Sequence, residues 1–348
     1  MKSSDNPPKK NNQSLWQIIV AILLIGFPVL MLFFNGNRAL RGITWGMNDE
    51  QSQVVAPSSL AVPEGTLTKP REKAPLFGVY DPESKFTGDT CFDIEQFYLS
   101  WISIDEKSVS TRLENIVLNN RIPFITIEPW NGSGGEMTLM QDILSGVYDT
   151  NIQDVINSLN GIKGKIYLSW GHEMDQDITK RYPWSGSDPA LYINAYRYFA
   201  DKLDKNLSSE IIWIWSPVGK KGCEKYWPGD NYADLVGFPI YSYPAWDRSY
   251  YGNIRSFKTW YDEKFKLVEQ FNKPVMIVEM GVTGSQDYQV YWLQEAFNTI
   301  KSIPAIEAVV FFQKKDTPGS WGENIETPDW RTDPEIITGF VTWMKSEY

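Results

Sequence analysis

Eight short apolar runs between residues 76 and 312 constrain the fold of this chain more than any other feature. Each run is rich in β-branched and aromatic residues, and longer segments between the runs carry apolar residues at helical spacing. Continuous apolar strands that alternate with amphipathic helices predict parallel strands buried on both faces. The runs cover residues 76–80, 96–103, 122–129, 165–170, 211–217, 235–241, 274–281 and 306–312. Their number, and the length of residues 76–348, predict a (β/α)8 TIM barrel.

The first crossover fits this pattern less well than the others. Between Tyr80 and Gln96 the sequence DPESKFTGDTCFDIE has no helical periodicity, and it leaves little room for a helix. We therefore expect either a barrel with an irregular first crossover or an open sheet of seven strands. Elsewhere the helix starts are clearer. Asp188 and Asp333 are each followed by proline, which pairs an N-cap residue with a residue suited to the first helical turn.

An apolar segment precedes the barrel. Residues 15–34 (LWQIIVAILLIGFPVLMLFF) contain no charged side chain, and a helix of 20 residues spans about 30 Å of hydrocarbon. We expect a transmembrane anchor that stays uncleaved, since no convincing cleavage site follows it. Three lysines precede it and two arginines follow it closely, which favours a cytoplasmic tail at residues 1–14 and a periplasmic or extracellular barrel. Residues 35–75 are polar and rich in proline and serine, as in a flexible linker.

Composition and motifs exclude several classes of partner. The net charge is −10 and the 33 lysines and arginines are dispersed, so no basic face suits nucleic acid. His172 is the only histidine, and Gln176 stands where a zinc site of the H-E-x-x-H type needs a second one. We expect no metal and no organic cofactor. Two cysteines, Cys91 and Cys223, allow either one bridge or two unpaired thiols, and we favour unpaired thiols.

Polar residues at the strand ends are the candidates for an active site, because the site of a (β/α)8 barrel lies at the carboxyl ends of its strands. Glu173 follows the fourth run, and Glu279 closes the seventh between apolar neighbours that disfavour an exposed charge. Strands four and seven lie on opposite sides of such a barrel, so the two carboxyl groups can face one another. One protonated and one ionised carboxyl group, about 5–5.5 Å apart, can hydrolyse a glycosidic bond with retention. Alternatively, each glutamate is a structural acceptor.

Aromatic residues make up 14% of the chain and include 15 tryptophans. Flat rings in excess suit a surface that stacks on sugar rings, although a tryptophan-rich core explains them equally well.

Several stretches are similar to glycoside hydrolase family 26, a group of (β/α)8 retaining endo-β-glycanases that includes mannanases, mixed-linkage glucanases and xylanases. They are YLSWGHEMD, YPWSG, WIWSP, YWPGDNYADLVGFPIY and MIVEMG, and the resemblance extends from about residue 77 to residue 343. It implies a retaining endo-β-glycanase that acts on a β-glucan or a β-mannan.

The resemblance also implies roles for single residues. Glu173 would be the acid/base and Glu279 the nucleophile, with His172 hydrogen-bonded at the catalytic centre and Tyr241 in contact with the nucleophile. The candidates for contact with the sugar are Trp101, Glu128, Trp130, Trp184, Trp215, Tyr243 and Trp321.

The sequence departs from the family pattern around these residues. A longer charged loop with Asp175 follows the His-Glu pair, Ser169-Trp170-Gly171 stands where mannanases carry an arginine, and Val218 and Pro239 replace an asparagine and an aspartate. These changes concern the walls of the sugar subsites rather than the two glutamates. They keep open a second function, in which the barrel binds polysaccharide without cutting it, as a subunit of an exopolysaccharide synthase or export complex.

Overall fold

The computed structural model describes residues 72–132, 138–176, 181–322 and 325–348. The predicted tail, the predicted anchor at residues 15–34 and nearly all of the predicted linker lie outside these residues. Among the residues described, no helix is long and apolar enough to span a bilayer.

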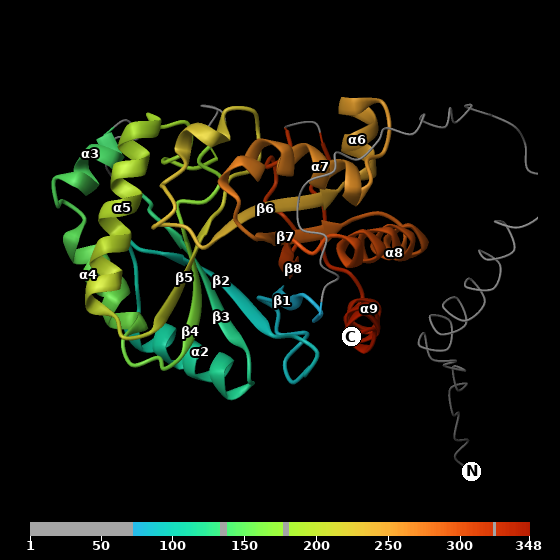
Figure 1. Cartoon of the computed structure of the whole chain (residues 1–348), viewed down its shortest axis with the longest axis horizontal. Helices are drawn as coiled ribbons and strands as arrows, with labels where there is room; N and C mark the ends of the chain where they lie inside the picture. The colour runs from blue at the N-terminus through green and yellow to red at the C-terminus, as the bar shows by residue number, and fades with distance from the viewer. Residues whose placement is uncertain (1–71, 133–137, 177–180, 323–324) are drawn as a thin grey trace, which may run out of the picture. The chain divides into compact units, whose positions relative to one another are not determined.

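Eight parallel strands form a closed barrel, in which consecutive strands pair and β8 closes onto β1 (Figure 1). The strands are β1 (Leu76–Tyr80), β2 (Ile94–Ser100), β3 (Ile122–Glu128), β4 (Lys165–Trp170), β5 (Glu210–Trp215), β6 (Leu235–Ser242), β7 (Val275–Val282) and β8 (Ile306–Phe312). The predicted barrel is confirmed, and the open sheet of seven strands is wrong.

Apolar side chains at alternate positions of the strands fill the barrel interior. This core consists of Ile94, Phe124, Tyr167, Ile214, Leu235, Met276, Val278, Ala308 and Val310. The residues between them are also apolar, since the other face of each strand packs against the outer helices.

Helices cover the outside of the barrel from β2 onward (Figure 1). They are α2 (Glu106–Leu118), α3 (Leu139–Leu144), α4 (Asp149–Leu159), α5 (Pro189–Asn206), α6 (Pro244–Tyr251), α7 (Phe257–Val268), α8 (Gln286–Ser302) and α9 (Pro334–Ser346), with short 3-10 turns at Cys223–Tyr226 and Glu269–Phe271. The predicted caps are confirmed, because the side chains of Asp188 and Asp333 accept from the amides of Leu191 and Glu335.

The first crossover, residues 81–93, contains no helix, as one of the two alternatives predicted. Polar contacts hold it instead. The buried guanidinium of Arg121 donates to the carbonyls of Phe86 and Asp89 at 2.6 and 2.8 Å, and the Asp81 carboxylate accepts from the Phe86 amide at 2.7 Å. These bonds pair backbone groups that would otherwise lie unsatisfied in an irregular segment.

Candidate active site

Glu173 lies just beyond β4, where the backbone turns sharply out of the strand. Gly171 and Glu173 both have left-handed φ angles of 55°, a conformation that costs a residue with a side chain about 1–3 kcal/mol. Neighbouring groups hold this conformation: the Glu173 amide donates to the Ser216 carbonyl at 2.7 Å, and the Ser185 hydroxyl donates to the Glu173 carbonyl at 3.0 Å. Strain that is held by its surroundings is typical of functional sites.

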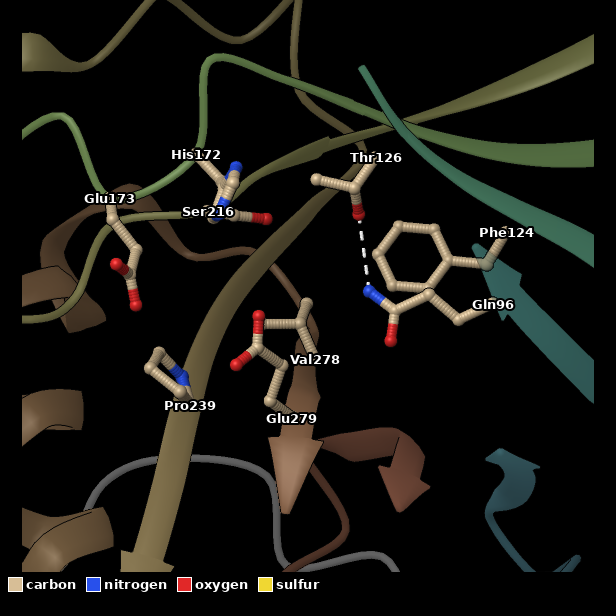
Figure 2. Close-up of a pocket in the computed structure, with 9 residues that line it drawn as sticks. All are labelled: Gln96, Phe124, Thr126, His172, Glu173, Ser216, Pro239, Val278 and Glu279. Carbon is tan, nitrogen blue, oxygen red and sulfur yellow. Dashed lines mark hydrogen bonds between the residues drawn. The ribbon is translucent and has the colours of Figure 1, made fainter. Parts of the chain in front are cut away.

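A β-bulge directs Glu279. Where β6 pairs with β7, Phe238 is opposite Ile277 and Pro239 is opposite Glu279, so Val278 is an extra residue in β7. One extra residue shifts the alternation of the side chains that follow. Val278 and Glu279 consequently line the same cavity inside the barrel, although they are adjacent in the sequence (Figure 2).

Two tyrosine hydroxyls hold the Glu279 carboxyl group. Tyr98 on β2 donates to Oε1 and Tyr241 on β6 donates to Oε2, each at 2.5 Å. Burial, together with the charge of Glu279, raises the pKa of both tyrosines well above the usual value, so both hydroxyls remain donors. With both oxygens accepting, Glu279 is arranged as an ionised carboxylate would be.

Glu173 and Glu279 both line one cleft of about 840 Å³. Figure 2 shows their carboxyl groups pointing into the same space, one from the loop after β4 and one from β7. Each residue is only 8% exposed. A second cavity, of about 10 Å³, lies deeper in the barrel and is also bordered by both glutamates. The structure thus brings together the two carboxyl groups that the sequence singled out.

The two carboxyl groups differ in their surroundings. Burial raises the pKa of Glu173 to about 7; the guanidinium of Arg181 opposes this shift, and the charge of Glu279 adds to it. The side-chain amide of Gln176 donates to Oε2 of Glu173. A carboxyl group with this pKa carries a proton in mildly acidic solution and can donate it in a reaction.

His172 is buried and neutral, because burial, assisted by Arg181, lowers the pKa of its imidazole to about 3. Its Nε2 lies 3.2 Å from the hydroxyl of Tyr182, a residue of the cleft wall. His172 borders the small cavity but does not line the cleft. Its observed contact therefore supports the wall and does not reach across the cleft.

Glu128, Trp130 and Trp321 line the cleft, as expected for residues that contact a sugar. The Trp130 indole donates to Glu128 at 3.0 Å, and burial raises the pKa of that carboxyl group while this bond opposes the shift. The Trp321 indole donates to Asp316 at 2.8 Å. Each ring is thus fixed by a carboxylate at the edge of the cleft.

The structure does not bring four other candidates to the cleft. They are Trp101, Trp184, Trp215 and Tyr243, of which the three tryptophans are 0% exposed and the tyrosine is 6% exposed. Trp101 and Trp184 instead donate to the carbonyls of Trp130 and His172, at 2.8 and 2.6 Å. These rings belong to the tryptophan-rich core and support the residues that form the wall.

Several cleft residues escaped the sequence analysis. Tyr98 lies inside β2, two residues before the strand ends, whereas the predicted candidates lie at the strand ends or beyond them. Its even spacing from Ile94, which faces the barrel interior, is the signal that could have found it. Arg181, which pairs with Asp316 at 3.3 Å, lies in the long loop after β4 and has no such signal.

Lys264 on α7 is a buried lysine that lines the cleft. It is 9% exposed, and its ammonium donates to the carbonyls of Val218 and Pro239 at 2.6 and 2.7 Å. Burial lowers its pKa to about 8. Val218 belongs to the loop after β5. The carboxylate of Asp175 also holds this loop, because it accepts from three successive amides, those of residues 218–220, at 2.7 to 3.0 Å. Lys264 and Asp175 thus tie the loop after β5 to β6 and to the loop that carries Glu173.

Cys91 and Cys223 are unpaired thiols, as favoured from the sequence. Within the described ranges, no group of three His, Cys, Asp or Glu side chains is placed to hold a metal ion.

Comparison with known proteins finds a family match in the part of the chain that holds the site. The family model described as glycosyl hydrolase family 26 matches residues 144–312, which include both glutamates. Endoglucanase H of Acetivibrio thermocellus is 24% identical over 267 residues, which are 71% of this chain and 27% of the relative. A β-1,3-xylanase of a Vibrio species is 24% identical over 200 residues, 55% of this chain and 38% of the relative. The chain therefore spans well under half the length of these relatives.

Solved structures show the same fold. A family 26 β-mannanase from Bacteroides ovatus superposes with a TM-score of 0.59 and 16% identity, covering 79% of this chain and 89% of that one. The family 26 protein GH26C of a Muricauda species gives a TM-score of 0.56 and 14% identity, covering 78% and 86%. The chain thus carries a glycosyl hydrolase family 26 domain at residues 144–312, on a (β/α)8 barrel.

Proposed function

We propose that this chain is an endo-acting glycosidase that hydrolyses a β-linked polysaccharide by double displacement. The observation that carries the proposal is the contrast between the two carboxyl groups. Burial raises the pKa of Glu173 to about 7, whereas Glu279 accepts from two tyrosine hydroxyls at 2.5 Å. One group is suited to give a proton and the other to attack.

In the first step the Glu279 carboxylate attacks the anomeric carbon, and Glu173 gives its proton to the leaving glycosidic oxygen. A covalent glycosyl-Glu279 intermediate forms as the bond to the leaving sugar breaks. In the second step ionised Glu173 takes a proton from water, which attacks the anomeric carbon and releases Glu279. Two inversions at one carbon leave the product with the configuration of the substrate.

The size and lining of the cleft support action within a chain rather than at its end. Its volume is about 840 Å³, and aromatic residues line it after two different strands, with Trp130 after β3 and Trp321 after β8. A β-glucan is the first substrate to test, because the endoglucanase relative matches the larger share of this chain. A β-mannan and a β-1,3-xylan follow, from the names of other relatives.

The test is the release of reducing ends from barley β-glucan, lichenan, curdlan, β-mannan and β-1,3-xylan. We expect the wild type to release them from at least one polysaccharide, and Glu173→Ala and Glu279→Ala to lose at least about 100-fold in rate. An activated 2-fluoro glycoside should label Glu279, and labelling of any other residue would remove Glu279 from the nucleophile's role. Binding of these polymers without release from any of them would instead favour the non-cutting subunit.

We further propose that residues 15–34 anchor the barrel outside the cytoplasm, on the strength of their uncharged apolar sequence. Added protease should then digest the barrel in cells whose outer layers are permeabilised while the cytoplasmic membrane stays intact. A barrel that is digested only after the cytoplasmic membrane is broken would contradict this.

A further inference from the structure

Helix α6 is an addition to the barrel, because α7 already follows β6 as its outer helix (Figure 1). It comes directly after β6, at the end of the barrel that holds the cleft. A helix that packs on a domain normally buries apolar side chains and exposes polar ones. Here the order is reversed, since the one buried residue of α6 is Asp247.

Asp247 explains how the helix is held. It is 1% exposed, and its carboxylate accepts from the Arg255 amide at 3.1 Å. This bond ties α6 to the segment that leads into α7. The Tyr251 ring adds to this anchor, because the Arg255 guanidinium lies over it at 4.3 Å, whereas the largely exposed ring of Tyr250 is not needed to hold the helix.

Three aromatic residues, Trp246, Tyr250 and Tyr251, form what we call the α6 aromatic face. The rings of Trp246 and Tyr250 stack at 4.9 Å with an angle of 6° between their planes. Tyr250 is 70% exposed and Tyr251 is 40% exposed. A stacked pair four residues apart stabilises a helix by only about 0.2–0.5 kcal/mol, which does not account for so much exposed ring surface on an eight-residue helix.

The α6 aromatic face continues the wall of the cleft. Trp246 and Tyr251 line the cleft together with Trp321. The ring of Trp321 lies 5.3 Å from that of Trp246 and 6.1 Å from that of Tyr241, whose hydroxyl contacts Glu279. A continuous series of rings thus leads from the nucleophile candidate to the exposed face of Tyr250.

We propose that the α6 aromatic face is a distal subsite, which binds pyranose rings of a β-linked glycan chain away from the bond that is cut. The apolar faces of the sugars pack on the rings of Trp246 and Tyr250, and Trp321 connects this subsite to the central cleft. This inference rests on the proposed function for its ligand class, but its binding can be measured without any hydrolysis.

The test uses the full chain with Glu279→Ala, so that polymer is bound but not cut, in affinity electrophoresis through gels that contain barley β-glucan or β-mannan. Adding Tyr250→Ala or Trp246→Ala should weaken binding about three- to tenfold. Tyr250→Phe should retain binding because it keeps the ring. The matched control is Tyr291→Ala on α8, a tyrosine that is 71% exposed and does not line the cleft.

If the polymer in the gel slows the Tyr250→Ala and Tyr291→Ala proteins equally, the proposed subsite is wrong. It is also wrong if neither polymer slows the Glu279→Ala protein that carries no second substitution. In active protein, the ratio of the rate on polysaccharide to the rate on a short aryl glycoside should also fall for Tyr250→Ala. If the wild type releases no reducing ends but Tyr250→Ala still weakens binding, then the proposed hydrolysis fails and the subsite stands.

Discussion

The hydroxyl of Tyr98 on β2 donates to the Glu279 carboxylate on β7 at 2.5 Å, across 181 residues of sequence. The bond spans the barrel interior, so it depends on closure of the barrel and on the bulge at Val278 together. Tyr241 holds the other oxygen from the neighbouring strand. The orientation of Glu279 is thus set by three strands and not by its own strand alone.

Tyr98→Phe should therefore lower kcat/KM about 10- to 100-fold, because a hydrogen bond to a charged group contributes about 1.5–3 kcal/mol. Removing only the hydroxyl leaves the packing of the ring in place. Initial rates on the best polysaccharide would measure the effect, with Tyr291→Phe on the protein surface as control. A Tyr98→Phe enzyme as fast as the control would show that this hydroxyl does not assist Glu279.

The rate should fall on the alkaline side of neutrality, because the proton that Glu173 gives is lost as the pH rises through its pKa of about 7. A profile of kcat/KM against pH would locate this limb. With a dinitrophenyl glycoside, whose leaving group needs no proton, Glu173→Gln should keep the first chemical step and lose the limb. An alkaline limb that persists in Glu173→Gln would assign it to another group.

Burial of Glu173 also predicts a dependence of stability on pH. Its pKa in the folded protein, about 7, exceeds the ordinary 4.5, so the folded state binds the proton more tightly. This contribution is present below about pH 4.5 and is lost as the pH rises through 7. Relative to wild type, Glu173→Gln should gain about 1–3 kcal/mol of unfolding free energy between pH 5 and pH 8. Denaturant titrations at both pH values test this, and an unchanged difference would contradict it.

The strands were the most predictable part of the molecule. Three of them, β1, β4 and β8, begin and end at the predicted residues, because strands buried on both faces are apolar without interruption. The two carboxyl groups were predictable for a related reason, since the carboxyl ends of parallel strands meet at one end of a barrel. The contacts of Arg181 were not, because Arg181 lies outside the strands and helices, where no periodic pattern predicts the position of a side chain.

The alternation of side chains along a strand explains why Trp101 and Trp215 were predicted in the cleft but lie in the core. Ile94 and Ile214 face the barrel interior, so Trp101 and Trp215, at odd spacings from them, face outward. Strand-end position alone does not distinguish the two faces. Glu279 shows the opposite case, because simple alternation from Met276 would turn it outward and only the bulge brings it into the cleft. A bulge of this kind has no clear signal in one sequence.

This distinction between wall and core can be tested with two tryptophans. Trp215 is fully buried against Trp227 and Phe271, so Trp215→Ala should cost about 3–5 kcal/mol of unfolding free energy. Trp130 lines the cleft, so Trp130→Ala should mainly raise KM. Thermal unfolding and steady-state kinetics on both variants would separate these effects. A Trp215→Ala protein of wild-type stability but raised KM would place that ring in contact with substrate after all.

Lys264 is a further buried charged residue whose removal has a defined consequence. Its ammonium donates to two carbonyls. One is that of Pro239, next to the bulge that directs Glu279, and the other is that of Val218, in the loop that Asp175 also holds. Lys264→Met keeps the length of the side chain but leaves both carbonyls without this donor, and each loss costs about 1–3 kcal/mol. We expect lower stability and a lower kcat, because Pro239 lies opposite Glu279 where β6 pairs with β7, and a higher KM, because Val218 and Pro239 also line the cleft.

A structural loss alone would also lower stability, so restoration of the charge decides between the two explanations. Lys264→Cys, in a protein with Cys91→Ser and Cys223→Ala, can be alkylated with bromoethylamine while unfolded and then refolded, which rebuilds an ammonium of nearly the same reach. The alkylated protein should regain both kcat and stability, whereas alkylation with a neutral reagent of similar length should regain neither. Recovery of kcat with the neutral reagent would mean that filling the space is sufficient and that the ammonium does not position the cleft.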